Sequence, residues 1–320
     1  MKPLEIDMFK LTTHKLAALA LLACVAFSAP AHAENDRPAS TLSRARAKSK
    51  ATKTGLLAVN GVDYYYELHG KGEPLLLLHG GLGSIEMFGP VLPTLAKSRQ
   101  VIAVDLHGHG RTALGTRAWT IEAQGDDMAA LVQRLGFEQV DVLGYSLGGG
   151  VALRMAIQKP QAVRRLVIAS AGFESEAFYP ALREQQKSMT ADVAPMMKDT
   201  PMFQSYAKIA PKVDDFPKLV GILGDYMRKK FDWSADVKKL SMPVMLVYGD
   251  ADMFRYDHVV KFYQLLGGGL QDAGWQRETM AKNRLAIIPN ATHYELFALP
   301  QLATTALPFL NGYSTAQTEK

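Results

Sequence analysis

Short apolar runs recur along this 320-residue chain, each bounded by glycine, proline or charged residues. A continuous apolar run of only four residues is typical of a strand that is buried on both faces of a parallel sheet. The runs are 75–78, 101–104, 140–143 with Asp141 inside it, 166–169, 244–247 and 285–288, and the β-prone segment 62–67 precedes them. Segments with helical spacing of apolar residues lie between or after them, at 121–135, 147–158, 257–266 and 300–307. The alternation predicts an α/β fold with a mostly parallel central sheet flanked by helices.

Residues 173–239 interrupt this alternation because they contain no run typical of a strand. The segment has five prolines and is rich in methionine and aromatic residues. A structureless loop of this length is uncommon in a compact domain, so we predict a helical insertion, or cap. Its methionine and aromatic side chains should mainly pack, and together they could roof an apolar pocket. We expect a core domain of residues 54–172 and 240–312, with the cap at 173–239 and a tail at 313–320.

The sequence GYSLG at 144–148 lies directly between a predicted strand and a predicted helix. Glycines at its two ends allow a sharp turn, which would expose the Ser146 hydroxyl and point the start of the next helix at it. A Gly/Ser loop without chemistry is the alternative. The strand before the motif and the helix after it favour Ser146 as a nucleophile.

A serine needs a base to become a nucleophile, and the base needs an acid to orient it. His293 follows the last predicted strand, at the sheet edge where Ser146 is expected, so we predict that it is the base and not an ordinary surface histidine. Asp250 and Asp252 both follow the strand 244–247, and either could be the acid. We favour Asp252.

An oxyanion hole would complete such a site. The glycine-rich turn HGGLG at 79–83 follows the strand 75–78 and can aim backbone N–H groups at a developing oxyanion. The N–H of Leu147, the residue after the predicted nucleophile, is the expected partner donor.

Together these motifs resemble the α/β-hydrolase superfamily, and more narrowly its cap-bearing serine esterases and carbon–carbon bond hydrolases. The resemblance covers residues 55–311 and rests on HGGLGS at 79–84, DLHGHGRT at 105–112, GYSLGG at 144–149, GDAD at 249–252 and NATH at 290–293. It implies an α/β-hydrolase fold with a helical cap inserted after the sixth strand. It also implies Gly81 as the first oxyanion donor, with Leu82 as the second choice, and no metal or organic cofactor.

The chain departs from the family pattern where D-x-R-G-x-G is usual, because His107 replaces the arginine. We expect this change to alter local hydrogen bonds and not the chemistry. Asp105, His107 and His109 could also suggest a metal site, but a structural turn is the favoured interpretation. Haloalkane dehalogenases and epoxide hydrolases carry aspartate at the position of Ser146, which argues against both classes.

The first 33 residues have the pattern of an export signal. An apolar run at 16–29 follows Lys10 and Lys15 and precedes Ala-His-Ala at 31–33. The run is shorter than the roughly 20 residues that a membrane span needs. We predict cleavage after Ala33 and an exported protein, periplasmic or secreted. Lipid attachment at Cys24, the only cysteine, is the alternative.

The net charge of +5 and the pI of about 9.1 come from the N-terminal region. The segment 34–53, predicted to be a flexible basic arm, has six basic and two acidic residues, whereas the chain from Thr54 onward has 27 of each. The charge therefore gives no reason to expect nucleic-acid binding. No feature of the sequence specifies an oligomeric state.

The sequence thus predicts an exported serine hydrolase that cleaves carboxylic esters with an apolar portion through a Ser-His-Asp triad and an acyl-enzyme. A lactonase, an amidase or a carbon–carbon bond hydrolase would use the same residues. A non-catalytic binding protein of the same fold is a further alternative.

Overall fold

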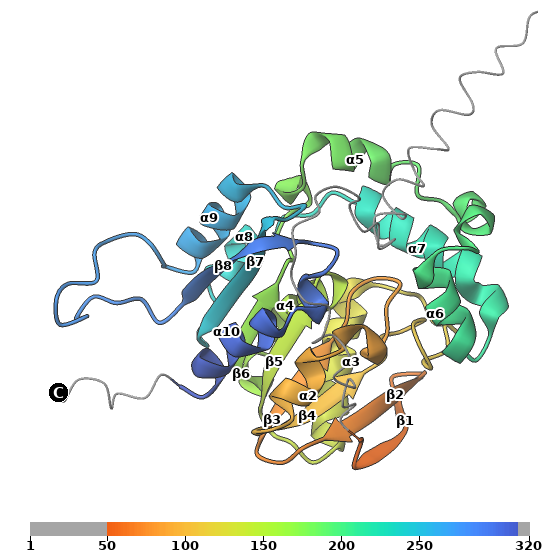
Figure 1. Ribbon diagram of the computed structural model, residues 1–320, viewed down its shortest axis with the longest axis horizontal. Coiled ribbons are helices and arrows are strands. Elements are labelled where there is room, and N and C mark those ends of the chain that lie inside the picture. Colours follow the sequence, from red (N-terminus) through yellow and green to blue (C-terminus); the bar gives the residue numbers. More distant parts are fainter. Residues whose placement is uncertain (1–49, 313–320) are drawn as a thin grey trace, which may run out of the picture.

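The computed structural model describes residues 50–312, which form one eight-stranded sheet with helices on both faces (Figure 1). The strand order is β1-β2-β4-β3-β5-β6-β7-β8; the pairs β1–β2 and β2–β4 are antiparallel and the others are parallel. The strands are β1 (Lys53–Val59), β2 (Val62–His69), β3 (Glu73–Leu78), β4 (Arg99–Val104), β5 (Val140–Tyr145), β6 (Val163–Ala169), β7 (Val244–Ala251) and β8 (Arg284–Thr292). The predicted mostly parallel α/β sheet is confirmed.

Four of the helices within residues 50–312, at 121–134, 147–158, 256–265 and 300–310, agree closely with the four predicted from apolar spacing. The helices are α2 (Val91–Leu95), α3 (Ile121–Arg134), α4 (Leu147–Gln158), α5 (Pro180–Gln186), α6 (Pro201–Ile209), α7 (Phe216–Arg228), α8 (Ser234–Val237), α9 (Tyr256–Leu265) and α10 (Pro300–Leu310). The predicted export signal, Cys24, residues 34–49 of the predicted arm and the tail 313–320 lie outside the described residues.

The strand β1 was not predicted. It forms an antiparallel hairpin with β2 around Asn60 and Gly61, whose φ angles are positive at 49° and 85°. Most of β1 is exposed or half-buried, so its sequence lacks the continuous apolar run that marks the buried strands. Lys53, expected to be the last residue of the arm, already pairs with Leu68 in this hairpin.

The apolar runs bury both faces of the sheet. In β3, Leu75 and Leu77 pack into one hydrophobic cluster, while Leu76 and Leu78 pack into the cluster on the opposite face. The helices α3, α4 and α9 cover the second face, and α2 and α10 cover the first. All four leucines are fully buried, which explains why these short runs have no polar alternation.

The segment between β6 and β7 is a helical insertion, as predicted. It contains α5 to α8 and short 3-10 turns, and Figure 1 shows α5, α6 and α7 gathered on one side of the core. We call residues 173–239 the cap. Its aromatic side chains pack on one another and on the core, and Phe173, Phe216 and Trp233 are among its buried residues.

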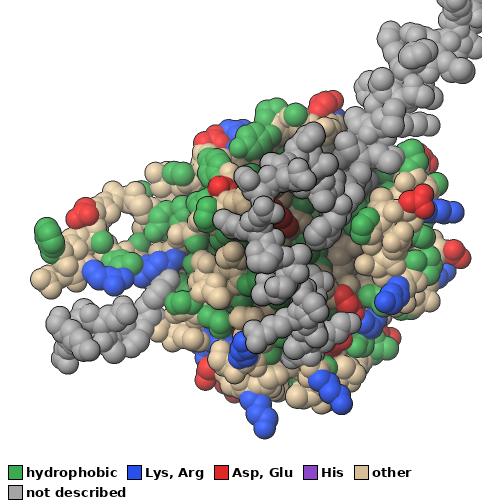
Figure 2. Space-filling model, viewed as in Figure 1, with side chains coloured by type: hydrophobic (Ala, Val, Ile, Leu, Met, Phe, Trp, Pro, Cys, Tyr) green, Lys and Arg blue, Asp and Glu red, His purple; other side chains and the backbone are tan. Residues whose placement is uncertain are grey.

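Charged side chains are dispersed over the surface. On the part of the face in Figure 2 where side chains are coloured, Lys and Arg lie among Asp and Glu and do not form a single basic patch. Within residues 50–312, no helix is both long and apolar enough to cross a membrane.

Two glycines allow the backbones of β3, β5 and α4 to touch. A Cβ atom on Gly148 would lie 2.4 Å from the carbonyl oxygen of Leu78, and one on Gly144 would lie 2.2 Å from the carbonyl oxygen of Gly148. Real Cβ atoms do not approach backbone this closely. The first turn of α4 can therefore pack against the ends of β3 and β5 only with glycine at both positions.

At the amino ends of the central strands, a buried ion pair joins β4 to β5. The Asp141 carboxylate accepts hydrogen bonds from Arg99 Nη1 at 2.7 Å and from Arg164 Nε and Nη2 at 2.9 Å each. The side chains of Asp141 and Arg99 are 0% and 2% exposed. Arg99 also donates to Asn311 Oδ1 at 2.9 Å, which ties the end of α10 to the sheet.

We expect Asp141→Ala to lower the free energy of unfolding by about 3–5 kcal/mol, because it leaves the buried Arg99 guanidinium without its carboxylate. Urea unfolding followed by far-UV circular dichroism would measure the loss. Glu73→Ala is the matched control, since Glu73 is a 64% exposed partner of Arg164 and its removal should change little. Equal unfolding midpoints for the two variants would contradict this account of the ion pair.

We expect Gly148→Ala to lower the free energy of unfolding by about 1–3 kcal/mol, because the added methyl group meets the Leu78 carbonyl oxygen. Gly81→Ala is the control: a Cβ there would find its nearest neighbour at 3.8 Å, an ordinary contact. Thermal unfolding should separate the two variants clearly. A Gly148→Ala protein as stable as Gly81→Ala would show that the tight contact is not required.

Candidate active site

The loops after β5, β7 and β8 bring Ser146, Asp252 and His293 together at the carboxyl edge of the sheet. His293 Nε2 lies 3.1 Å from Ser146 Oγ, and His293 Nδ1 lies 3.1 Å from Asp252 Oδ1. The structure therefore unites the three side chains singled out in the sequence, at the edge where open α/β sheets bind their ligands.

Ser146 occupies a sharp turn between β5 and α4. Its φ and ψ angles are 52° and −117°, a conformation that costs a non-glycine residue about 1–3 kcal/mol. Two backbone hydrogen bonds hold it: the Ser146 N–H donates to the Ala169 carbonyl at 2.9 Å, and the Gly150 N–H donates to the Ser146 carbonyl at 3.0 Å. The turn fixes the hydroxyl at the start of α4, clear of the sheet.

Strand pairing places the histidine beside Asp252 and not beside Asp250. The strands β7 and β8 pair as far as Ala251 and Thr292. Asp252 and His293 are the next residues, so they leave the sheet side by side. Asp250 is exposed, and its Oδ1 accepts the Ala291 N–H at 3.0 Å. The geometry thus distinguishes two aspartates that the sequence left open, and it agrees with the preference for Asp252.

Asp252 is held as a carboxylate in a buried position. Burial by itself would raise its pKa, but hydrogen bonds with His293, Ser170 and the Gly249 N–H keep the pKa below its usual value. Ser170, which sequence reasoning missed, donates its hydroxyl to Asp252 Oδ2. Its place directly after β6, at the same sheet edge, was the available signal. A charged, fixed carboxylate at His293 Nδ1 favours the tautomer whose Nε2 can accept the Ser146 proton.

Tyr145 is a second contact that the sequence did not reveal. Its hydroxyl donates to the backbone carbonyl of His293, and its ring lies 5.2 Å from the His293 ring between centroids. A Cβ on Gly80 would lie 2.8 Å from the same ring. Tyr145, which occupies the variable position before the serine in the GxSxG motif, therefore packs between the histidine loop and the turn after β3.

The predicted oxyanion donors border the same space as Ser146. Gly81, Leu82 and Leu147 all line the cavity above the serine. Leu147 is the first residue of α4, where backbone N–H groups have no partner inside the helix. Leu82 has a positive φ of 54°, so the turn after β3 curls back toward α4.

The cavity that contains Ser146 and His293 is mostly apolar and has a volume of about 430 Å³. We call it the Ser146 cavity. The cap supplies much of its wall, including Phe178, Met189, Met202, Leu223 and Met227. Of its two lining carboxylates, Glu174 binds Lys261 at 2.9 Å and Glu86 pairs with Arg111. An uncharged, largely apolar molecule fits these walls best.

The DLHGHG turn is built from internal contacts. Asp105 accepts the N–H of Ile85 at 2.8 Å and the N–H of Arg111 at 2.9 Å, and His107 Nε2 lies 2.8 Å from a backbone carbonyl oxygen. Burial lowers the pKa of His109 to about 3, so this side chain is uncharged at neutral pH. Among the described residues, no group of three or more His, Cys, Asp or Glu side chains could hold a metal ion.

Solved structures with the same fold include enzymes of several hydrolase classes. A carboxylesterase from Bacillus subtilis matches with a TM-score of 0.59 and 17% identity, covering 95% of this chain and 98% of that chain. A meta-cleavage product hydrolase from Pseudomonas fluorescens matches with a TM-score of 0.61 and 19% identity, covering 82% and 99%. At these identities the likeness concerns the fold.

Relatives found by sequence match parts of the chain. An uncharacterized protein of Mycobacterium tuberculosis is 26% identical over 226 residues, which are 61% of this chain and 66% of that protein. A 2-hydroxymuconate semialdehyde hydrolase of a Pseudomonas species is 41% identical over 108 residues, or 32% of this chain and 38% of the relative. The matched regions are thus under two thirds of these relatives' lengths.

A family model described as the alpha/beta hydrolase fold matches residues 73–273, which span β3 to the segment after α9. The matched range holds the turn after β3, the GxSxG turn, the cap and the strand that precedes Asp252. With the sheet order and the convergence of strand ends described above, this match shows that the chain belongs to the α/β hydrolase family.

Proposed function

We propose that the protein is an exported serine hydrolase that cleaves carboxylic esters. The observation that carries the proposal is the hydrogen-bonded series Ser146–His293–Asp252, with both links at 3.1 Å, at the floor of an apolar cavity. Export rests on the N-terminal sequence pattern alone.

Acylation would begin with a proton transfer. His293 Nε2 accepts the Ser146 hydroxyl proton as Oγ attacks the ester carbonyl, and the Asp252 carboxylate stabilises the positive charge that forms on the His293 imidazolium. The new oxyanion accepts hydrogen bonds from the N–H groups of Gly81 and Leu147. When the carbon–oxygen bond breaks, His293 returns the proton to the departing alcohol and the acyl group remains on Ser146.

Deacylation would repeat these steps with water. His293 takes a proton from a water molecule as the oxygen attacks the acyl carbonyl, and the same two N–H groups hold the oxyanion. Collapse of the intermediate breaks the bond to Oγ, and Ser146 recovers its proton from His293. The carboxylic acid then leaves the cavity.

A carbon–carbon bond hydrolase is the second candidate, and one observation favours it. The relative with 41% identity over 108 residues is named as a 2-hydroxymuconate semialdehyde hydrolase. The predicted export signal weighs weakly against this candidate, because the usual substrates of carbon–carbon bond hydrolases are intracellular catabolites. Parallel assays with esters and with a ring-cleavage dienoate would separate the two activities.

We expect Ser146→Ala to lower the rate of p-nitrophenyl ester hydrolysis by about 10⁶-fold, because it removes the nucleophile. A fluorophosphonate probe should label the parent protein at Ser146 and leave the variant unlabelled. A parent protein that hydrolyses no short or medium ester and resists the probe would refute the proposal and favour a binding protein.

We expect Asp252→Asn to lower kcat by about 10⁴-fold, since an amide would favour the wrong histidine tautomer. The matched control is Asp250→Asn, two residues earlier, where the exposed carboxylate bonds only backbone and kcat should stay near the parent value. Stopped-flow or steady-state ester assays on folded proteins would measure both. Comparable losses in the two variants would remove Asp252 from its assigned role.

A further inference from the structure

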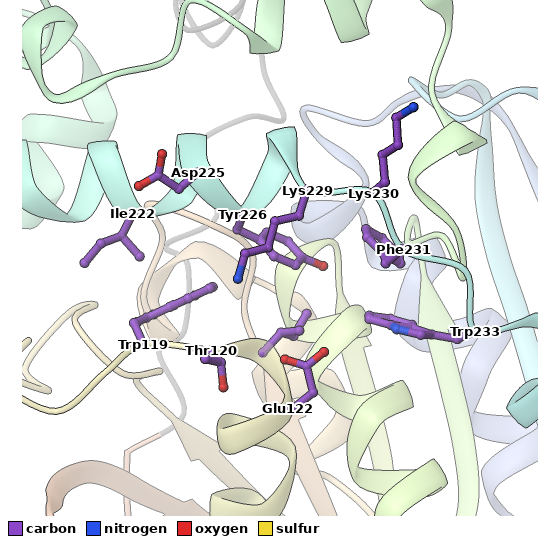
Figure 3. Close-up of a pocket in the computed structure, with 11 residues that line it drawn as sticks. Trp119, Thr120, Glu122, Ile222, Asp225, Tyr226, Lys229, Lys230, Phe231 and Trp233 are labelled. Carbon is purple, nitrogen blue, oxygen red and sulfur yellow. The ribbon is translucent and has the colours of Figure 1, made fainter.

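A second cavity, of about 560 Å³, borders α7 on a face next to the one that lines the Ser146 cavity. We call it the outer cavity. It lies between α7 and the start of α3, with the segment 229–233 closing one side (Figure 3). Its apolar wall consists of Trp119, Ile121, Ile222, Tyr226, Phe231 and Trp233.

Aromatic rings run around this cavity in an unbroken series. Trp119 meets Tyr226 edge-on at 5.7 Å between ring centroids, Tyr226 stacks with Phe231 at 6.1 Å, and Phe231 stacks with Trp233 at 4.4 Å. Such a surface suits an alkyl or aryl group, which gains burial without needing a hydrogen-bond partner.

Four charged residues of the described part of the chain border the outer cavity, and Figure 3 shows Lys229 and Glu122 extending toward its centre. Asp225 is bound to Arg228 at 2.6 Å, and Figure 3 shows Asp225 and Lys230 pointing away from the aromatic rings. Glu122 and Lys229 are both exposed, and their opposite charges give the cavity no excess of either sign. The lining therefore favours an uncharged hydrophobic group over an ionic ligand.

The two cavities share part of one wall. Tyr226 and Phe231 line both, whereas Leu223 and Met227 face only the Ser146 cavity and Ile222 faces only the outer cavity. The helix α7 and the segment after it thus separate the two cavities, and the Tyr226 and Phe231 side chains are the part of the wall that both cavities share.

This shared wall is close to the nucleophile. A Cβ on Gly150, one helical turn after Ser146, would lie 3.6 Å from the Tyr226 hydroxyl oxygen. Gly150 itself lines the Ser146 cavity. The Tyr226 and Phe231 rings, which line both cavities, therefore lie between a chain held at Ser146 and the outer cavity.

We propose that the outer cavity binds the distal end of a long hydrophobic ester, with Tyr226 and Phe231 as the residues that determine the accepted chain length. The proposal rests on the proposed ester hydrolysis at Ser146. Short esters would use the Ser146 cavity alone, whereas long alkyl or aryl-alkyl esters would occupy both cavities.

The first test measures kcat/KM for p-nitrophenyl butyrate and p-nitrophenyl laurate. Ile222→Trp fills the outer cavity and should lower the laurate-to-butyrate ratio about tenfold, because roughly two methylene groups lose their burial. Tyr226→Ala thins the shared wall and should raise the ratio. Ratios within twofold of the parent in both variants would overturn the proposal.

Matched controls lie elsewhere on the cap. Tyr179→Ala and Val213→Trp make the same kinds of change at exposed positions that border neither cavity, and the ratio should stay at the parent value. A shift in these controls equal to that in the test variants would show a general effect of cap substitution and would also overturn the proposal.

A binding readout keeps this test independent of turnover. Trp119 and Trp233 line the outer cavity, and the third tryptophan of the chain, Trp275, is fully exposed. In a Ser146→Ala, Trp275→Phe protein, ethyl laurate should change the tryptophan emission and ethyl butyrate should not. If the parent hydrolyses no ester, the proposed function fails, yet a laurate-specific change would still support the outer site. No change with laurate would overturn it.

Discussion

The contact between Gly148 and the Leu78 carbonyl is the constraint on which the geometry of the site depends. It sets the start of α4 against the carboxyl ends of β3 and β5, with no side chain between the backbones. Ser146 must then cross from strand to helix in a single residue, in a positive-φ conformation. The same closeness brings the turn that carries Gly81 beside the N–H of Leu147. One packing constraint thus fixes the hydroxyl and both expected oxyanion donors.

The amino and carboxyl ends of the central strands differ in the interactions that they make. The amino ends of the central strands are joined by the buried Arg99–Asp141 pair, far along the strands from Ser146. The carboxyl ends carry the polar side chains of the candidate site, among them Ser146, whose positive-φ conformation costs free energy. Favourable interactions at the amino ends of the strands can therefore offset the free-energy cost of the Ser146 conformation at the carboxyl ends.

The fold and the principal site residues could be predicted because their signals are local. A strand buried on both faces is mostly apolar, with a buried charge such as Asp141 tolerated only when it is paired, and a turn as sharp as that at Ser146 needs glycine around it. The hairpin strand β1 escaped prediction because it is half-exposed and lacks such a run. The assignment of Asp252 over Asp250, and the contacts of Ser170 and Tyr145, depend on strand register, which brings together residues far apart in the chain. The division of the apolar space into two cavities was equally inaccessible, because it follows from how α7 and the segment 229–233 pack above the start of α3.

The pairing of β7 with β8 makes Asp252 and His293 one structural unit of the site. Asp252 and His293 leave adjacent strands directly after a paired position, so any displacement of this edge carries them together. Ser146 belongs to the separate unit of β5 and α4. The two units are tied by Tyr145, the residue before Ser146, whose hydroxyl donates to the His293 carbonyl. A displacement of one unit against the other would therefore have to break this tie as well as the serine–histidine link.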